Sequence, residues 1–522
     1  MSLLKNKKLI ALQIFAGFFF LFNFQLKSGA SSIYFAPCNY WKDNSPKTYD
    51  FNTQCISAYN KMMAMHFDEA NVILQKEKKE HPNNLIPVFI ENYEDFFRIT
   101  FNEDVNELNK LEPNKEIRLA QLIQGPTSSP YYYYCKAEVE LQWAMARLKF
   151  EQYSTAFFEI KKAYSELMLN KTKFPEFIAN NKSLGLIHAL IGTVPTSYQW
   201  AVSFMGFSGN VNQGMTELKS VLDPTKKSTY IFYDEARYLY MFLLFNLENK
   251  NADVWDICNA TDFPDVKTNP LACFMKGYFA RKAGKNDDAI SILSNQNFGI
   301  GVFKIFYLDY LLGCSKLNRL DVDSNVPLER FITNFKGLNY LKDAYQKLGW
   351  FQLSMNSNYD KYDYYLNFCK TKGAKFTDID KQAFNEATTE TAPNITLLKS
   401  KLLFDGGYFQ QAISLLAGKS TKDFLLKKDQ IEFTYRAGRI YHEWGKPNDA
   451  KGYYVATINL GGKEIYYFAA NAALELGYIY EAENDLTKAK YYYQKCLDMP
   501  NTEYKNSLDQ KAKAALNRLN SK

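Results

Sequence analysis

The chain has 522 residues, of which 47% are hydrophobic, 23% charged and 16% aromatic, and its formal net charge is +7. Four of the 63 basic residues lie within residues 1–30, which leaves 59 basic against 56 acidic residues in the rest of the chain. So small and evenly mixed an excess excludes an electrostatic nucleic-acid binder. The remaining chain is also too long for one compact core, which favours a repeat architecture over a single globular domain.

The first thirty residues are predicted to be a secretory signal peptide. A lysine-rich start at residues 5–8 precedes an apolar run at 9–24, and residues 28–30 are small enough for cleavage. The run is shorter than the ~20 residues of a spanning helix, so cleavage is favoured over an uncleaved anchor. Cys38 follows no lipoprotein motif, and no other stretch resembles a membrane span. We therefore expect an exported chain without a transmembrane segment, for which peripheral association with the envelope stays open.

From residue 31 onward, apolar residues recur at three and four spacing, which predicts helix pairs along nearly the whole chain. Small residues that precede large ones recur across about eight candidate pairs. A small residue lets two helices approach closely, and a large one fills the gap. The upstream examples include Ala58, Ala70 and Leu74; Ala144, Ala156 and Ile160; Gly209, Gly214 and Leu218; Gly277, Ala289 and Leu293; Tyr362 and Leu366; Ala412 and Leu416.

The clearest copies lie near the C-terminus, at an offset of 39 residues (477 − 438). Four pairs match at this offset: Gly438/Gly477, Tyr441/Tyr480, Ala450/Ala489 and Tyr454/Tyr493. The pattern resembles the tetratricopeptide repeat, whose period is about 34 residues. The resemblance implies an all-α, superhelical solenoid of antiparallel helix pairs, irregular in its N-terminal and middle parts. It also favours a binding function over catalysis.

Two further stretches, 185–218 and 340–355, resemble the Iml2 / tetratricopeptide-repeat-protein-39 family of eukaryotic solenoids. The first holds Leu-Gly-Leu-Ile, Val-Pro-Thr and Phe-Met-Gly-Phe-Ser-Gly-Asn, and the second reads Tyr-Leu-Lys-Asp-Ala-Tyr-Gln-Lys-Leu-Gly-Trp at its start. Breaks at 222–228 and 370–394 suggest four segments. These are the signal peptide (1–30), irregular N-terminal repeats (31–225), middle repeats (226–370) and regular C-terminal repeats (371–522).

Enzyme signals are thin, and we expect neither catalysis nor a bound cofactor or metal. The four histidines, at 66, 81, 188 and 442, are too far apart for a helical metal site. His188 lies in an apolar stretch and is predicted to be a hydrogen-bonded core residue. The glycine-rich segment 206–214 lacks the Lys-Ser/Thr of a phosphate-binding loop. Absence of these motifs lowers the expectation of an enzyme without eliminating it.

The eight cysteines are scattered, and no two are close enough for a metal knuckle or a Cys-x-x-Cys motif. Export would permit disulfides, and the pairs closest in sequence are Cys38 with Cys55 and Cys258 with Cys273. We favour buried free thiols that fill the core. The tyrosine run at 131–134 follows a Ser-Ser-Pro sequence and is predicted to begin a helix and to pack in the core.

The resemblance implies that the first helix of each pair lines a concave groove. Transferring those positions gives nine candidate binding residues: Phe274, Tyr278, Arg281, Tyr435, Arg439, His442, Asn471, Leu474 and Tyr478. Aromatic rings with arginine suit a protein or peptide ligand. The Lys/Asn pattern that clamps a C-terminal carboxylate in some relatives is missing. Ordinary solvated or packing roles remain an equal alternative for these residues.

The main hypothesis is a periplasmic or outer-membrane-associated bacterial scaffold. One alternative is a carbohydrate-binding protein or an enzyme with a tyrosine-lined groove. Another is a lumenal eukaryotic protein with glycosylation sequons at Asn170, Asn181, Asn259 and Asn394.

Overall fold

The computed structural model describes residues 46–194, 199–223, 225, 227, 229–248, 250–389 and 391–520. The predicted signal peptide lies outside these residues. Within them the backbone forms helices and no β-strand, apart from one isolated bridge between Thr48 and Asn84. The predicted all-α class is therefore confirmed. None of the helices described is both long and apolar enough to span a bilayer.

The N-terminal helices are α2 (Thr53–Met63), α3 (Phe67–Glu80), α4 (Ile86–Asn102), α5 (Val105–Leu122), α6 (Pro130–Leu148), α7 (Tyr153–Lys173), α8 (Asn180–Gly192), α9 (Gln199–Phe204), α10 (Val211–Ser220), α11 (Tyr233–Leu243), the π-helical η4 (Leu244–Glu248) and α12 (Asn251–Cys258). The middle helices are α13 (Pro270–Lys282), α14 (Asn286–Ser294), α15 (Tyr307–Asn318), α16 (Asn325–Asn334), α17 (Leu341–Asn356), α18 (Tyr359–Thr371), α19 (Asp378–Ala387), α20 (Ile395–Asp405), α21 (Phe409–Ser414) and the 3-10 turn η5 (Thr421–Asp423). The C-terminal helices are α22 (Lys427–Glu443), α23 (Pro447–Gly461), α24 (Tyr467–Ala482), α25 (Leu486–Leu497) and α26 (Lys505–Asn520).

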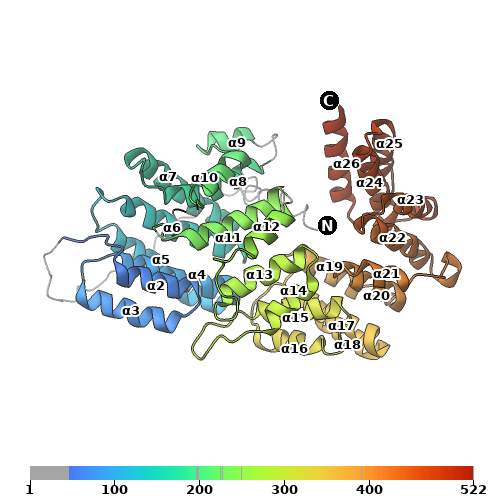
Figure 1. The fold of residues 1–522 in the computed structure, drawn as a ribbon, viewed down its shortest axis with the longest axis horizontal. Coiled ribbons are helices and arrows are strands. Elements are labelled where there is room, and N and C mark those ends of the chain that lie inside the picture. The colour runs from blue at the N-terminus through green and yellow to red at the C-terminus, as the bar shows by residue number, and fades with distance from the viewer. Residues whose placement is uncertain are drawn as a thin grey trace, which may run out of the picture.

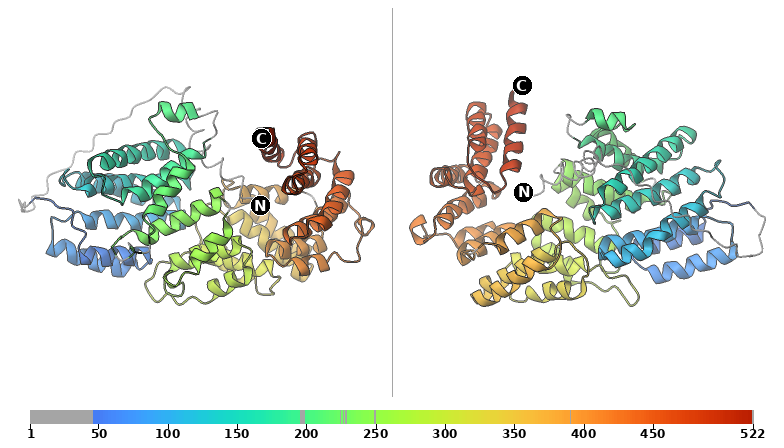
Figure 2. Two further views of the ribbon diagram at one scale, coloured as in Figure 1. Left: turned by 45° about the horizontal axis from the view of Figure 1, so that its top comes forward. Right: turned by 180° about the vertical axis from the view of Figure 1, so that it is seen from behind.

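Consecutive helices pack against each other as antiparallel pairs. Extensive contacts join α2 with α3, α6 with α7, α8 with α10, α13 with α14, α15 with α16, α17 with α18, α22 with α23, and α24 with α25, and α23 also packs closely on α24. Figure 1 shows the pairs following one another along a curved path, with the N-terminal helices and α22–α26 on opposite sides of the middle helices. The two views of Figure 2 show the same arrangement. The predicted helical solenoid is confirmed, while the number of pairs and the segment boundaries stay predictions.

Local sequence explains where many of these helices begin and end. Ser129 accepts a hydrogen bond from the backbone of Tyr131 and Pro130 occupies the first turn, so α6 begins where the tyrosine run was expected to begin it. Between paired helices the chain turns through left-handed backbone, with φ of 72° at Gly284 and 76° at Gly445. Glycine adopts that conformation without the steric cost that other residues incur.

The small–large pattern of the sequence forms the seam within each pair. A Cβ atom added at Gly477 would lie 2.3 Å from the ring of Tyr493, and one at Gly438 would lie 2.7 Å from the ring of Tyr454. Both tyrosines are fully buried. The same relation joins Gly277 with Leu293, Gly185 with Leu218, and Gly313 with Leu328. The predicted packing role is therefore confirmed for Gly277, Gly438 and Gly477, while Gly185 with Leu218 and Gly313 with Leu328 are further pairs that were not predicted from the sequence.

The polar stretch 370–394, interpreted as a break, contains helix α19. This helix packs on α17 and α18, and it buries Asp380, Ala383 and Ala387. Thr377 caps it by accepting a hydrogen bond from the backbone of Asp380. Because α19 buries two alanines and an aspartate but no large apolar side chain, its polar composition resembles that of a break between repeats.

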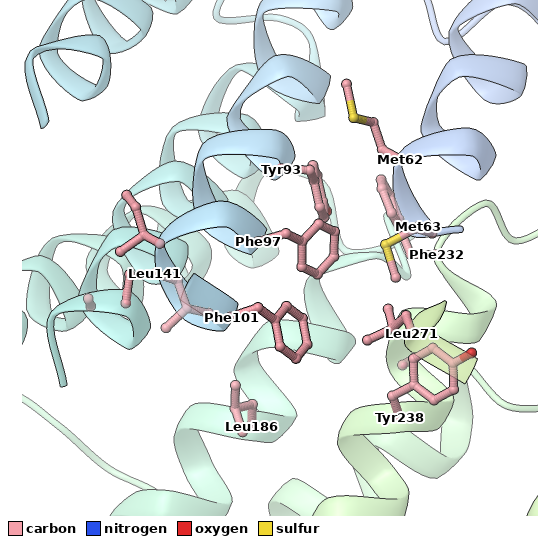
Figure 3. Close-up of a cluster of buried hydrophobic side chains, with 14 of the residues drawn as sticks. Met62, Met63, Tyr93, Phe97, Phe101, Leu141, Leu186, Phe232, Tyr238 and Leu271 are labelled. Atoms are coloured by element: carbon pink, nitrogen blue, oxygen red, sulfur yellow. The ribbon is translucent and has the colours of Figure 1, made fainter. Parts of the chain in front are cut away.

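The N-terminal helices share a core that is aromatic and partly charged. Figure 3 shows Tyr93, Phe97 and Phe101 along one face of α4, in the same buried cluster as Met62 and Phe232. Bulky rings bury a large apolar area, so a few of them can hold helices that lack regular repeat spacing.

Charges are also buried in this N-terminal core. Lys182 of α8 has no exposed surface and forms ion pairs with Glu138 of α6 (2.8 Å) and Glu235 of α11 (2.6 Å). The hydroxyls of Tyr59 and Tyr93 each donate a hydrogen bond to Glu235, both at 2.9 Å. This network joins α2, α4, α6, α8 and α11.

His188 is a core residue, as predicted. It is 2% exposed, and its Nδ1 lies 2.6 Å from a carboxylate oxygen of Glu217 and 3.0 Å from the amide nitrogen of Gln213. Burial opposes the charge of Glu217, but its hydrogen bond and attraction to His188 outweigh that effect and lower the pKa of this carboxyl. The histidine is therefore part of the packing between α8 and α10.

Candidate functional site: the inner face of the repeats

The first helices of successive pairs pack on one another. Helix α13 contacts α15, α15 contacts α17, α17 contacts α20, α20 contacts α22, and α22 contacts α24. The second helices, such as α14, α16 and α23, pack mainly on neighbouring first helices. Their contacts with one another are much smaller. Elements that remain in contact along a solenoid lie on the inside of its curve. We call the exposed surface of α13, α15, α17, α20, α22 and α24 the inner face.

At one end of the inner face, the last turns of α13 present aromatic and basic side chains. The rings of Phe274 and Tyr278 stack with centroids 6.1 Å apart, and the Lys282 amine lies 5.6 Å from the Tyr278 ring centroid. Arg281 has a buried Nε without a hydrogen-bond partner. Burial and the neighbouring Arg281 charge lower the pKa of Lys282 to about 8. Phe274, Tyr278 and Arg281 were predicted site residues, whereas Lys282 was not.

The next part of the inner face is a set of paired charges on α15 and α17. The Tyr310 hydroxyl donates to Asp343 at 2.7 Å, and Asp343 pairs with Lys347 at 2.9 Å. The Lys347 amine lies 3.8 Å from the Trp350 ring centroid, and the Trp350 indole donates to Glu386 of α19 at 2.6 Å. Burial opposes the charge of Lys347, but Asp343 outweighs it and raises the pKa of the amine.

Helix α20 continues this row. Lys401 pairs with Asp405 at 2.6 Å and lies 4.6 Å from the Trp350 ring centroid. The Asp405 side chain is 39% exposed, and the surrounding protein still reduces its hydration. Burial would raise the pKa of Asp405, but Lys401 and then Arg436 of α22 outweigh it and lower the pKa. On a concave surface, a side chain can be partly exposed to solvent and still be surrounded by many protein atoms, as Asp405 is.

In the C-terminal repeats, the inner face becomes more tightly packed. Arg439 is 6% exposed and pairs with Glu475 of α24 at 2.6 Å and with Glu443 at 2.9 Å. His442 lies 3.5 Å from Glu475, and its Nδ1 is 3.2 Å from the hydroxyl of Tyr454. Burial is the largest effect on His442 and lowers its pKa.

The remaining predicted residues pack against each other. The Asn471 amide donates to the Tyr435 hydroxyl at 2.5 Å, and Tyr435 is buried. Leu474 has no exposed surface, and Tyr478 contacts the ring of Tyr493 with centroids 5.6 Å apart. The structure therefore brings the C-terminal candidates together, with Tyr435, Arg439 and Leu474 buried and the other six of the nine partly exposed. A binding role for the nine residues stays a prediction.

The charged residues that sequence reasoning missed had a weak signal. Asp343 with Lys347, and Lys401 with Asp405, are opposite charges four residues apart, which on a helix share one face. Such pairs are common on any exposed helix. Only their place on first helices distinguishes them, and the middle repeats were too diverged for those helices to be identified from the sequence.

Other candidate sites are poorer. Two cavities, of about 290 and 590 Å³, lie beside α18 and beside α20 and α21, and neither is lined by a predicted site residue. The described residues contain no group of His, Cys, Asp and Glu suited to a metal. The seven cysteines in this part of the chain are free and buried, so Cys258 and Cys273 are not joined, while Cys38 lies outside it.

The paired helices, the glycine seams and the continuous inner face define an all-α helical-repeat protein. A family model described as the tetratricopeptide repeat matches residues 470–502, which span most of α24, all of α25 and the turn that follows. No curated protein shows a significant match to the chain. The match supports a tetratricopeptide-type protein, while the narrower resemblance to the Iml2 family stays a prediction.

Proposed function

We propose that this protein is a non-enzymatic scaffold of the cell envelope, and that its inner face binds an extended segment of a partner protein. Tetratricopeptide-type solenoids offer long concave surfaces to their partners. The observation that carries the proposal is the charged row on α17, α20 and α22. Asp343 and Arg436 of this row are buried, whereas the side chains of Lys401 and Asp405 are 27% and 39% exposed and accessible to a partner.

The chemistry of this row suits an extended chain. Charges spaced along several helices can pair with successive side chains of a bound segment, which gives direction and specificity more than raw affinity. The buried Trp350 ring lies beneath Lys347 and Lys401 and holds their amines in place. An extended segment meets each first helix in turn, whereas a compact small molecule would need an enclosed pocket.

Site-specific photo-cross-linking tests this function. A photoreactive residue at Lys401, whose side chain is 27% exposed on the inner face, should cross-link in native cells to one short stretch of one protein. The same residue at Tyr491, which is 56% exposed on α25, serves as the outer-face control and should not capture that stretch. Equal capture from both positions, or capture of sugars alone, would contradict the proposal.

Export is a separate part of the proposal and rests on the signal-peptide pattern of residues 1–30. A charged residue in the apolar run blocks recognition of such a segment. We expect Phe19→Arg to retain the protein inside the cell, while the control Phe19→Leu leaves it in the envelope fraction. Cell fractionation with N-terminal sequencing measures both. Intracellular protein from the unaltered chain would overturn the export proposal and leave the binding proposal intact.

A further inference from the structure

Most charges on the inner face have a partner of opposite sign. The pairs are Asp343 with Lys347, Lys401 with Asp405, Glu432 with Arg436, and Arg439 with Glu475. At the α13 end, by contrast, Arg281 and Lys282 stand next to each other in one helical turn. Neither forms an ion pair or a side-chain hydrogen bond with any residue that the structure describes. The inner face therefore carries an uncompensated positive end.

This arrangement is unfavourable for the isolated protein. The Arg281 Nε is buried without an acceptor, and a buried donor left unpaired destabilises the folded protein. Two adjacent like charges also repel each other. The C-terminus of a helix attracts cations through its dipole, which explains why basic residues stand there. The dipole provides no acceptor for the Arg281 side chain. A bound anion would supply an acceptor for the Arg281 Nε and would offset the two positive charges.

We propose that Arg281 and Lys282 bind the acidic side chains of an extended partner segment, and that this contact sets the direction in which the segment lies along the inner face. The inference rests on the proposed binding function. Because Arg281 and Lys282 are adjacent and neither is paired, the α13 end attracts negative charge. An acidic stretch of the partner would lie there, and its less charged remainder would extend towards α17 and α20.

The local chemistry fits a carboxylate. A guanidinium presents a planar set of donors that matches the two oxygens of a carboxylate, and an ammonium adds a mobile point charge. The Phe274 and Tyr278 rings stack beside these groups and form an apolar wall. Partial exposure of Tyr278, Arg281 and Lys282 leaves them accessible to a ligand. Burial at the foot of the site reduces the competition from water and salt.

The ionisation of Lys282 gives the site a pH signature. The groups that act on it are Arg281 on α13, Asp405 on α20, Cys314 on α15 and Asp343 on α17. Burial raises the pKa of the Cys314 thiol, which favours its neutral form. A bound carboxylate favours the charged amine, so binding is strongest where Lys282 is protonated. Affinity should therefore fall as the pH rises through about 8.

Fluorescence anisotropy with a defined peptide tests the inference. The probe is a labelled extended peptide with four glutamates and both termini blocked, which excludes recognition of a free carboxyl terminus. The reference is the same peptide with four glutamines. We expect the full-length protein to prefer the glutamate peptide, and the double variant Arg281→Gln/Lys282→Gln to bind it at least about tenfold more weakly.

A matched double variant, Lys161→Gln/Lys162→Gln, removes two cations from exposed positions of α7 and should keep the affinity of the unaltered protein. Lys282→Arg should retain binding at pH 9, where the unaltered protein loses it. Circular dichroism confirms that each variant is folded, and the single variant Lys282→Gln replaces the double variant if the latter unfolds.

Equal affinity for the two peptides, or equal loss in the α7 and α13 variants, would overturn the inference. The photo-cross-linking result at position 401 is independent of this outcome. If the partner segment still cross-links there while the α13 variant binds normally, the inner face is a binding surface and the acidic anchor is wrong. If neither experiment gives a signal, the proposed function itself fails.

Discussion

The N-terminal helices α2–α12 and the C-terminal helices α22–α26 reach the same paired arrangement through different cores (Figure 1). In the C-terminal part, each seam is local. Gly477 and Tyr493 lie on the two helices of one pair, and Gly438 and Tyr454 repeat the arrangement one repeat earlier. Both contacts join residues that are sixteen positions apart, so the pattern is visible in the sequence.

In the N-terminal part, the decisive contacts are long-range. Glu235 accepts hydrogen bonds from Tyr59, which is 176 residues away, and from Tyr93, which is 142 residues away. Burial is the largest effect on Glu138, and it raises the pKa of this carboxyl despite the neighbouring Lys182. A helical repeat can therefore be specified in two ways: by close packing of small against large residues within one pair, or by a buried polar network that joins several helices.

The sharpest test of this difference is Lys182→Met. The substitution leaves two carboxylates, Glu138 and Glu235, in the core without a cation, and breaking a buried ion pair from one side costs about 3–5 kcal/mol. We expect a loss of that size in the free energy of unfolding of the N-terminal helices, measured by urea denaturation with hydrogen exchange to locate it. The loss should be smaller at pH 5 than at pH 8, because burial raises the pKa of Glu138 and favours its protonation at the lower pH.

Lys162→Met is the matched control, since Lys162 is 63% exposed and its partner Glu140 keeps a second cation, Lys115, at 2.6 Å. Exposed pairs contribute about 0–1 kcal/mol. Similar losses at the two positions would show that the buried network does not hold the N-terminal helices, and the contrast between the two regions would disappear.

Long-range polar contacts of this kind also occur in the middle of the chain, between α19 and α17. Asp380 of α19 is fully buried and accepts hydrogen bonds from the backbone amides of Tyr340 (2.8 Å) and Asp343 (3.2 Å) at the start of α17. Burial raises the pKa of Asp380 to about 6, and nearby Asp343 adds to it, although the hydrogen bonds oppose the shift. The folded state thus holds this proton more tightly than the unfolded state.

For a carboxyl with a raised pKa, the stabilising contribution is complete below its ordinary pKa and is lost as the pH rises through about 6. The unaltered protein should therefore gain stability relative to Asp380→Asn when the pH falls from 7 to 4, by about 2–3 kcal/mol. Paired urea titrations at the two pH values measure this difference. A constant difference would show that Asp380 does not titrate in this range.

The smallest expected effect concerns the local seam. In Gly477→Ala, the added methyl group would lie 2.3 Å from the Tyr493 ring, and overpacking of this kind costs about 1–3 kcal/mol. Gly452→Ala is the control within the same repeats, because no atom lies within 4 Å of its added Cβ. Alanine is the better helix former, so this control should stabilise the protein by about 0.4–1 kcal/mol.

Thermal denaturation of the two variants gives the comparison directly. A stabilising Gly477→Ala would mean that close approach of the helices is not what selects glycine in the seam. Tyr493→Leu in the Gly477→Ala background should recover part of the loss, because the smaller side chain makes room for the methyl group, and a double-mutant cycle measures that coupling.

The sequence predicted the parts of this protein that depend on short-range periodicity. Helical pairing follows from apolar residues at three and four spacing, and the seams follow from glycine and alanine opposite large side chains. Prediction failed for α19, whose three buried residues, Asp380, Ala383 and Ala387, are small or polar. It also missed the charged row of the inner face, because Lys347 and Asp405 look like ordinary surface residues until the neighbouring first helices are placed.

The sequence by itself determined the helical class, the repeat seams and the burial of His188. Each of these features depends on residues within one or two neighbouring helices. These residues are close together in the sequence, so their spacing along the chain predicts their contacts. Tertiary structure alone decided that Lys182 is a core residue, that Tyr435 and Leu474 are buried, and that Arg281 and Lys282 are the unpaired end of the inner face. The physical reason is that burial and charge compensation depend on which helices, distant in the sequence, come into contact. The curvature of the solenoid determines those contacts.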